Sequence, residues 1–367
     1  MHSGGHSFKL AVSAPAVLAL GGGLKNTLCA VRGDAAFVSA SIGNLDNADA
    51  CLALEAAVDQ LCEMHGIEPA VVAHDLHPDF FSTRLAVQIA ARRRIPALGV
   101  QHHHAHVAAV CAELGLVEPV LGLAMDGVGL GSDGQAWGGE LLRLEGARFE
   151  RLGHLQPLRL PGGDRAARET WRMGAAALDA LGRNAEIARR FADQPAATTV
   201  AAMLQSDFNC PPTSSLGRLF DAACGLLGLC PRQSFEGQAS MALQALAEAH
   251  GDVDALPAGY RIAATLDFRP LLAVLADGLD AGYGAALFHA TLAAGLADWA
   301  SAAAARYDIR QLACGGGCFL NQLLLRQLSD RLLERGVQVL VARRLSPGDS
   351  GLSLGQAWVA IRRWQEN

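Results

Sequence analysis

Several common features are missing from this 367-residue chain. No apolar run is long enough to cross a bilayer, so no membrane partner is expected. No lysine- or arginine-rich run occurs, and 36 acidic residues outnumber 30 basic ones, which gives a formal net charge of −6. Nucleic-acid-binding surfaces are built from clustered positive charge, so a nucleic-acid partner is not expected either.

The cysteines are also without a pattern. They number nine, which is odd, and no two are spaced as Cys-x-x-Cys. The sequence therefore favours neither a disulfide framework nor a structural zinc ribbon, and reduced thiols of this kind are typical of a cytoplasmic protein. The apolar stretch 10–20 contains Pro15 and has one lysine before it, so we interpret it as a loop followed by a strand and not as a signal peptide.

The composition that remains is globular, with 51% hydrophobic and 18% charged residues. A chain of this length can form two lobes, each with its own core. Residues 1–14 are expected to be a loose lead-in. Helices and strands then alternate up to residue 118, after an initial set of strands predicted near 16–20, 28–32 and 35–41. This order is typical of a ribonuclease-H-like lobe, and the apolar strand 119–125 starts the same plan again.

The middle of the chain is predicted to be helical. One helix is expected over residues 165–181, with Asp164 as its cap. Two further helices are expected to begin close to Asp221 and Glu236. A carboxylate at such a position either caps the helix or reaches a hydroxyl such as that of a ribose, and capping is the simpler interpretation for each residue alone.

The densest functional signal is the run Gln101-His102-His103-His104-Ala105-His106, which holds four of the twelve histidines. It lies between a predicted strand, 95–100, and a predicted helix that ends near residue 116, and open α/β folds bind ligands at such junctions. His102 and His106 are four residues apart, so on a helix they share one face. This spacing suits two neutral imidazoles on one metal ion, whereas the alternative is a polar helix start with surface histidines.

Two aspartates at the ends of predicted elements, Asp126 and Asp349, are also candidate functional residues. Asp126 ends the strand 119–125 and is followed by Gly127 and Gly129, which would let a ligand approach the backbone closely. Asp126 is thus a candidate metal ligand or acceptor for substrate, although an aspartate serving a tight turn explains it equally well. Asp349 begins the last predicted helix, from which it could return to the histidines.

Two glycine-rich turns are candidates for phosphate binding. The turn 21–23 is followed by Lys25 and Asn26, which could add side-chain donors to the backbone N–H groups. The turn 315–317 lies between a predicted strand and a helix, where nucleotide phosphates often bind. It is not a Walker loop, because no Lys-Ser/Thr pair follows it. The alternative for either turn is that the glycines only reverse the chain.

In this order the motifs resemble the carboxy-terminal half of the HypF family of hydrogenase maturation carbamoyltransferases. The resemblance runs from about residue 15 to the end of the sequence. It is most specific in the His-His-His-Ala-His run and in the segment Asp-Gly-x-Gly-x-Gly-x-Asp-Gly-x-x-Trp-Gly-Gly-Glu at 126–140. The segments that carry it are 21–27, 101–106, 126–129, 137–140, 161–164, 217–221, 235–239, 315–321 and 349–357.

The resemblance implies an α/β fold of the actin-like class, which includes sugar kinases and Hsp70, with two ribonuclease-H-like lobes around a nucleotide cleft. The N-terminal lobe would cover residues 15–118, completed by the C-terminal helix at about 345–367. The C-terminal lobe would cover residues 119–344 and contain a helical insertion.

The resemblance also implies a metal held by His102, His106, Asp126 and Asp349, a donor set that suits Fe(II) or Zn(II). Lys25 would lie near the phosphoryl group and would join His102, His106 and Asp126 in catalysis. The residues implied around the nucleotide are Gly127, Gly129, Asp221, Glu236, Gly315, Gly316, Gly317 and Asn321.

The activity implied is the transfer of carbamoyl from carbamoyl-adenylate to the C-terminal cysteine of the partner HypE, for the cyanide ligands of [NiFe]-hydrogenase. ATP and carbamoyl phosphate would supply the adenylate. A complete HypF also carries an acylphosphatase domain, Cys-x-x-Cys zinc modules and a YrdC-like domain that makes the adenylate. None fits before residue 15, so we expect a transfer module whose adenylate is made either by a separate adenylate-forming protein or, in a compromised way, by this chain.

Three alternatives follow from the same motifs. The chain could be a non-catalytic nucleotide- and metal-binding scaffold, an O-carbamoyltransferase with a small-molecule acceptor, or a tRNA threonylcarbamoyltransferase subunit. The acidic charge argues against tRNA, and the complete set of histidines and aspartates argues against a decayed site. A plain sugar kinase or chaperone would not need the histidine pair.

Overall fold

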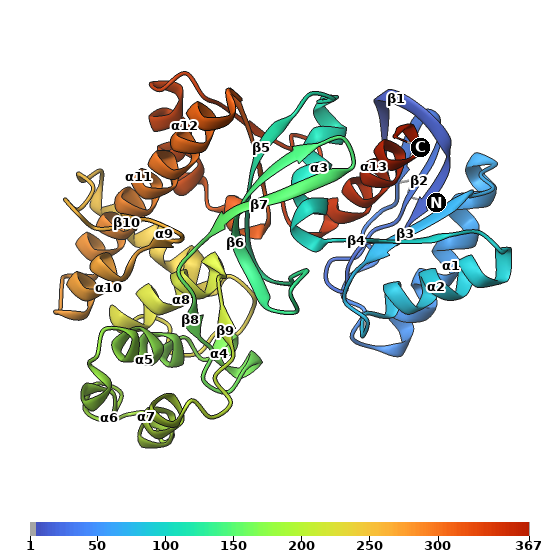
Figure 1. Cartoon of the computed structure of the whole chain (residues 1–367). Coiled ribbons are helices and arrows are strands. Elements are labelled where there is room, and N and C mark those ends of the chain that lie inside the picture. Colours follow the sequence, from blue (N-terminus) through green and yellow to red (C-terminus); the bar gives the residue numbers. More distant parts are fainter. Residues whose placement is uncertain (1–4, 367) are drawn as a thin grey trace.

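The computed structural model describes residues 5–366 and shows two mixed α/β lobes side by side (Figure 1). The first lobe contains a four-stranded sheet in the order β2-β1-β3-β4, in which β2 is antiparallel to β1 and the other neighbours are parallel. Its elements are β1 (His6–Ala19), β2 (Cys29–Val38), α1 (Ala48–His65), β3 (Val71–Asp75), α2 (Phe81–Arg93), β4 (Ala97–Val100) and α3 (His102–Leu114).

The second lobe contains a seven-stranded sheet in the order β13-β12-β5-β6-β9-β8, with β7 paired to β6. Its strands are β5 (Val120–Leu130), β6 (Ala136–Glu145), β7 (Arg148–His154), β8 (Leu158–Arg159), β9 (Pro212–Thr213), β12 (Gln311–Gly315) and β13 (Gln338–Val341). Its longer helices are α5 (Thr170–Ala180), α7 (Ala197–Ser206), α8 (Leu216–Leu226), α9 (Gln238–His250), α10 (Arg269–Ala276), α11 (Ala281–Tyr307) and α12 (Gln322–Leu333).

Short elements complete the chain. The helices are α4 (Asp164–Arg168) and α6 (Ile187–Arg190), and the 3-10 turns are η1 (Asn184–Glu186), η2 (Gly317–Leu320) and η3 (Asp349–Gly351). A small hairpin pairs β10 (Arg261–Ile262) with β11 (Leu266–Asp267), and the last helix is α13 (Leu352–Gln365). Over residues 5–366, no helix has the length and apolar character needed to cross a membrane.

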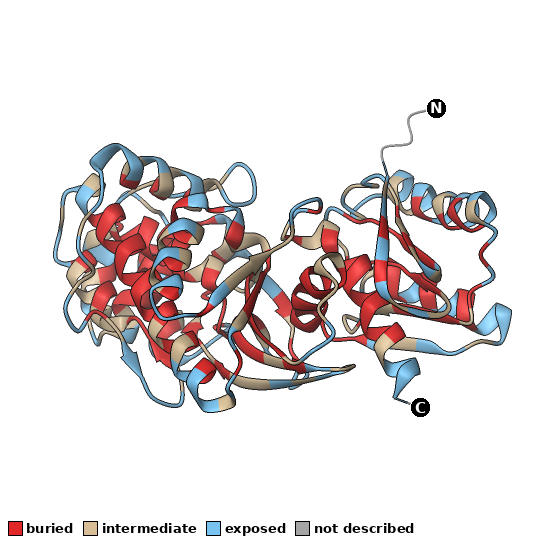
Figure 2. Ribbon diagram, turned by 90° about the horizontal axis from the view of Figure 1, so that it is seen from above, coloured by how far each residue is buried: buried red, intermediate tan, exposed pale blue. Residues whose placement is uncertain are grey.

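Side chains alternate between the two faces of each sheet, as the pleat requires. Leu18 of β1 and Leu20, just after the strand, pack with α1 and α2, whereas Val17 and Ala19 of β1 pack with α3 and α13. The hydrophobic core around Val17 and Ala19 also includes Ala124 of β5. Helices α3 and α13 therefore lie between the two sheets (Figures 1 and 2). Because this core joins strands of both lobes, the lobe boundaries at 118 and 344 stay a prediction.

The predicted loose lead-in is wrong for residues 6–14, which belong to β1, while residues 1–4 lie outside the described part. The three short strands predicted after it are two long ones, since 28–32 and 35–38 form the single strand β2. The pairing continues to His6 and Val38 through two register shifts near Ala14. Irregularities of this kind let a strand bend without ending, and the sequence pattern there resembles a loop.

The helix predicted over residues 165–181 is also wrong, because it is broken at Glu169. The backbone there has φ −114° and ψ 85°, which separates α4 from α5. Its buried carboxylate binds Arg165, Arg172 and Arg232, and these ion pairs hold the break in place. The helix cap is Gly163 with φ 58°, and no side chain, Asp164 included, makes a capping bond.

Helix α3 packs against its neighbours through backbone atoms. A methyl group at Gly355 of α13 would overlap the carbonyl oxygen of Ala105. On the other side, a methyl group at Gly315 of β12 would lie 2.6 Å from the carbonyl oxygen of His106. These contacts require residues without side chains, so the two glycines set how closely α13 and β12 approach the histidine helix.

We therefore expect Gly355→Ala to lower the free energy of unfolding by roughly 1–3 kcal/mol, because overpacking forces the two helices apart. Urea unfolding of both proteins measures this difference. Gly355→Leu should cost more, since a larger side chain needs a larger displacement. Equal stability of the three proteins would contradict the proposed close contact.

Candidate active site

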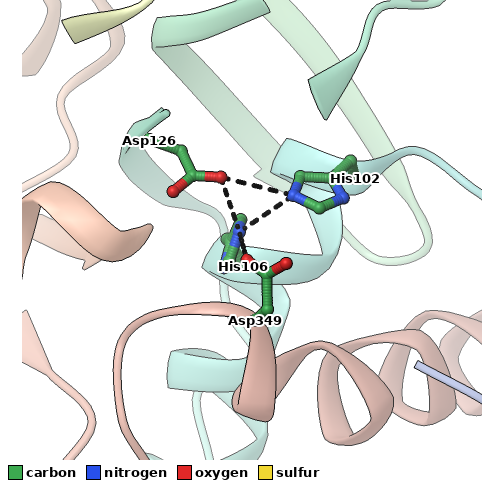
Figure 3. A group of neighbouring side chains, drawn as sticks. All are labelled: His102, His106, Asp126 and Asp349. Atoms are coloured by element: carbon green, nitrogen blue, oxygen red, sulfur yellow. Dashed lines mark hydrogen bonds and ion pairs between the residues drawn. The ribbon is translucent and has the colours of Figure 1, made fainter. Parts of the chain in front are cut away.

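Four of the side chains singled out in the sequence converge between the lobes (Figure 3). His102 and His106 come from the start of α3, Asp126 from β5 and Asp349 from η3. The two Nε2 atoms lie 3.2 Å apart, and Asp126 Oδ2 lies 3.4 and 3.5 Å from them. Asp349 Oδ1 lies 3.7 Å from His106 Nε2, and the four ligand atoms are all within 4.8 Å of one another.

This arrangement fits a tetrahedrally coordinated divalent ion. Ligand atoms about 2.0–2.2 Å from such an ion lie roughly 3.3–3.6 Å from one another. Most of the separations above are close to this range. Two imidazole nitrogens and two carboxylate oxygens are suitable donors for Fe(II) or Zn(II). The identity of the metal, and metal binding itself, stay predictions.

The protonation of the group shows why a cation is favoured there. Burial first, and then the neighbouring charge of Asp126, together raise the pKa of Asp349 to about 6. Burial alone would lower the pKa of His102, but nearby carboxylates, Asp75 first, hold this pKa well above its usual value. Crowded buried carboxylates thus retain protons on their neighbours, and a divalent ion would displace those protons.

Hydrogen bonds fix the elements that carry the four side chains. Gln101 caps α3 by accepting the backbone N–H of His104, and its amide nitrogen donates to the carbonyl of Leu130 at the end of β5. At the other end of α3, the carboxylate of Glu113 accepts three successive backbone N–H groups, of residues 343–345. Helix α3 is thereby joined both to β5 and to the segment that leads to η3.

Several of the predicted nucleotide-binding glycines border the cluster. Gly317 donates its backbone N–H to Asp126 Oδ1 over 3.0 Å. A methyl group at Gly129 would lie 2.6 Å from the ring of His102, and a methyl group at Gly316 would overlap the backbone of β5. Gly127 has open space around its Cα atom. The structure thus places the predicted turn 315–317 beside the metal candidates, while its contact with a nucleotide stays a prediction.

The other predicted ligand-binding residues contact each other or nearby residues. Lys25 Nζ lies 3.0 Å from Glu236 Oε2, and both side chains are about half exposed. Asp221 is buried beside Arg218, with Nε to Oδ2 at 2.6 Å, and burial raises the pKa of Asp221 to about 6 against the effect of that arginine. Asn321 caps α12 and donates to a buried histidine. The roles of these residues toward ribose or phosphate stay predictions.

Sequence reasoning missed Asp75, which is fully buried at the end of β3. Its Oδ2 lies 2.7 Å from Nδ1 of His102. A signal was available, because β3 is the parallel neighbour of β4 and the histidine run follows β4 directly. The carboxyl ends of parallel neighbouring strands meet at one edge of the sheet, so Asp75 and His102 had to lie close together.

Glu140 was also missed as a supporting residue. Its buried Oε1 accepts the N–H groups of Gly138 and Gly139 and the hydroxyl of Ser214, and its Oε2 accepts from Arg151 over 2.6 Å. The next residue, Ser215, contacts the carbonyl of Asp126 over 3.0 Å. The Trp-Gly-Gly-Glu motif therefore supports the part of β5 that carries Asp126, which lies inside this strand and not, as predicted, at its end.

The chain is similar to known proteins in both sequence and fold. A family model described as "Carbamoyltransferase, Kae1-like Domain, second subdomain" matches residues 122–356, and one described as "HypF Kae1-like domain" matches residues 12–113. A crystal structure titled full-length HypF in the phosphate- and nucleotide-bound form is similar, with TM-score 0.90 and 31% identity. The match covers 98% of this chain and 48% of that one, and it confirms the predicted α/β fold class.

Two curated relatives from Cupriavidus necator are similar over nearly the whole chain. "Carbamoyltransferase HypF2" is 53% identical over 97% of this chain and 48% of its own length. "Carbamoyltransferase HypF homolog" is 51% identical over 95% of this chain and 92% of its own length. The chain thus spans about half of the first relative and most of the second.

We expect the four converging side chains to bind a single divalent ion. The His106→Ala variant should lose this ion, because only one of the two donors on α3 remains. Elemental analysis of the metal content after dialysis checks this, with His250→Ala as the control variant. His250 is exposed and distant in sequence from the cluster. Equal metal content in both variants and the parent protein would exclude His106 as a ligand.

Proposed function

Because the chain belongs to the HypF carbamoyltransferase family, we propose that it transfers a carbamoyl group from carbamoyl-adenylate to the C-terminal cysteine thiol of a HypE-like acceptor. This step would serve cyanide ligand synthesis in [NiFe]-hydrogenase maturation. The observation that supports the proposal best is the convergence of two imidazoles and two carboxylates from three separate regions of the chain. A sugar kinase or chaperone of similar fold class would have no use for this donor set.

In the proposed step the thiolate sulfur forms a bond to the carbamoyl carbon, and the bond from that carbon to the phosphate oxygen breaks. The electron pair of the broken bond leaves with AMP. The metal, when bound, would supply Lewis acidity and a template for the phosphate and carbamoyl oxygens. His102 and His106 would hold it as neutral donors, together with Asp126 and Asp349.

The residues around this site would orient the adenylate. Asp126 is held by the backbone N–H of Gly317, which leaves its other oxygen directed at the two imidazoles. The turn 315–317 lies beside Asp126 through Gly317, and its backbone N–H groups are the proposed donors to the phosphate of the adenylate. The similar crystal structure holds phosphate and nucleotide, according to its description, which supports a nucleotide as the ligand of this region.

Mass spectrometry of a HypE-like acceptor tests the transfer. We expect the acceptor to gain one carbamoyl group when it is incubated with this chain, a divalent metal and preformed carbamoyl-adenylate. Replacing the adenylate by ATP and carbamoyl phosphate shows whether this chain also needs a separate adenylate-forming protein. An acceptor without its terminal cysteine and the His106→Ala variant are the controls.

The other outcomes separate the alternatives. An acceptor that binds but stays unmodified in every mixture would contradict the transfer and favour a scaffold. Carbamoylation of an added small-molecule hydroxyl instead of the protein thiol would favour an O-carbamoyltransferase. Transfer that His106→Ala leaves unchanged would exclude the metal candidates from the reaction.

Lys25 provides a second test, because we propose that it contacts the phosphoryl group after leaving Glu236. Lys25→Ala should weaken ATP or AMP binding about tenfold, or ~1.4 kcal/mol, as expected for losing a charge-assisted bond. Lys25→Arg should retain part of the affinity. Calorimetric titration measures both. Lys9, the other lysine of the chain, is exposed on β1, so Lys9→Ala is the matched control. Equal nucleotide affinities for all variants would exclude a contact between Lys25 and the phosphoryl group.

A further inference from the structure

Asp75 is a carboxylate with no access to solvent, and its contacts lead to the metal candidates. One oxygen, Oδ1, accepts the backbone N–H of His77 over 2.9 Å. The other, Oδ2, lies 2.7 Å from Nδ1 of His102. The backbone of Asp75 is fixed as well, because its carbonyl accepts the hydroxyl of Thr83 over 3.1 Å. The side chain is therefore held in one position by contacts on both oxygens.

The bond to Asp75 determines how His102 can act. An ionised carboxylate only accepts hydrogen bonds, so Nδ1 of His102 must carry a hydrogen. In the neutral ring Nε2 is then free of a proton, and this is the atom that faces His106 and Asp126. A histidine binds a metal through such an unprotonated nitrogen, while its second nitrogen commonly donates to a carboxylate.

Because Asp75 is buried, its contact with His102 affects the stability of the site. Taking a carboxylate out of water is costly unless it is paired and hydrogen-bonded. Burial would raise the pKa of Asp75, but the charges of and hydrogen bonds from His102 and the more peripheral His77 lower it. Of these two partners, His102 also faces the other candidate ligands.

We propose that Asp75 is a positioning residue of the metal site, which accepts the Nδ1–H of His102 and holds Nε2 of that ring toward the ion. This inference rests on the proposed function, since it takes His102, His106, Asp126 and Asp349 as ligands. Asp75 lies on β3, outside the motifs that carry the family resemblance. Through its contact with His102, Asp75 connects β3 of the four-stranded sheet to helix α3.

The test measures metal binding directly, with Co(II) as the probe. Visible absorption reports the coordination of Co(II), and competition with a chelator gives the affinity. Asp75→Asn keeps the size of the side chain and an acceptor oxygen but removes the charge, and we expect it to weaken binding 10- to 100-fold. Asp75→Ala leaves Nδ1–H unpaired and frees the ring, so it should weaken binding further and change the absorption spectrum.

Asp79→Asn is the matched control, because Asp79 is an exposed carboxylate in the turn that follows β3. It should bind Co(II) like the parent chain. Thermal unfolding of each metal-free protein checks that the variants are folded. The role through His102 is tested by combining Asp75→Asn with His102→Ala, in which the asparagine should cause no further loss of affinity, since the ligand it supports is gone.

The outcomes are distinct. Parent-like affinity and spectrum in folded Asp75→Asn and Asp75→Ala would overturn the inference and leave the metal site standing. A full additional loss in the double variant would overturn it too, because Asp75 would then act without His102. Failure of the parent chain to bind Co(II), Zn(II) or Fe(II) would overturn the metal site itself, and this inference with it.

Discussion

The site depends on how closely α3 approaches its two neighbours. Gly355 of α13 meets the backbone at Ala105, and Gly315 of β12 meets it at His106, without a side chain between them. Interiors are packed too tightly to absorb even one extra methyl group without displacement. These contacts bring η3 and Asp126 of β5 within a few ångströms of two histidines that are more than 200 residues away from Asp349 in sequence. Backbone contact therefore sets the distances among the four candidate ligands.

Charge is the second constraint on this region. Asp75, Asp126 and Asp349 approach the same pair of imidazoles, and two of these carboxylates are almost completely shielded from water. Buried like charges destabilise a fold unless opposite charge is near. A proton on His102 can supply part of it, which agrees with the raised pKa of His102. A divalent cation would supply more, and it would do so where Asp126 and Asp349 meet the two imidazoles.

The local sequence predicted that His102 and His106 share a helix face, because they are four residues apart. The complete set with Asp126 and Asp349 came from the resemblance to the HypF family. Strand pairing far along the chain was harder to predict. The first half of β1, residues 6–14, was missed because its pairing is irregular and involves only β2. The Lys25–Glu236 contact joins two loops far apart in the chain, which no local pattern reveals.

The aspartates of this region have different proposed roles because their surroundings differ. Asp126 has one oxygen held by a backbone N–H and one directed at the imidazoles, which suits a ligand. Asp75 has both oxygens engaged at the far side of His102, which suits orientation of that ring. Asp221 faces Arg218, but burial outweighs the effect of this arginine and raises the pKa of Asp221 to about 6. A ribose hydroxyl would therefore have to compete with Arg218 for Asp221, whereas a metal ion meets carboxylate oxygens that lack a comparable partner.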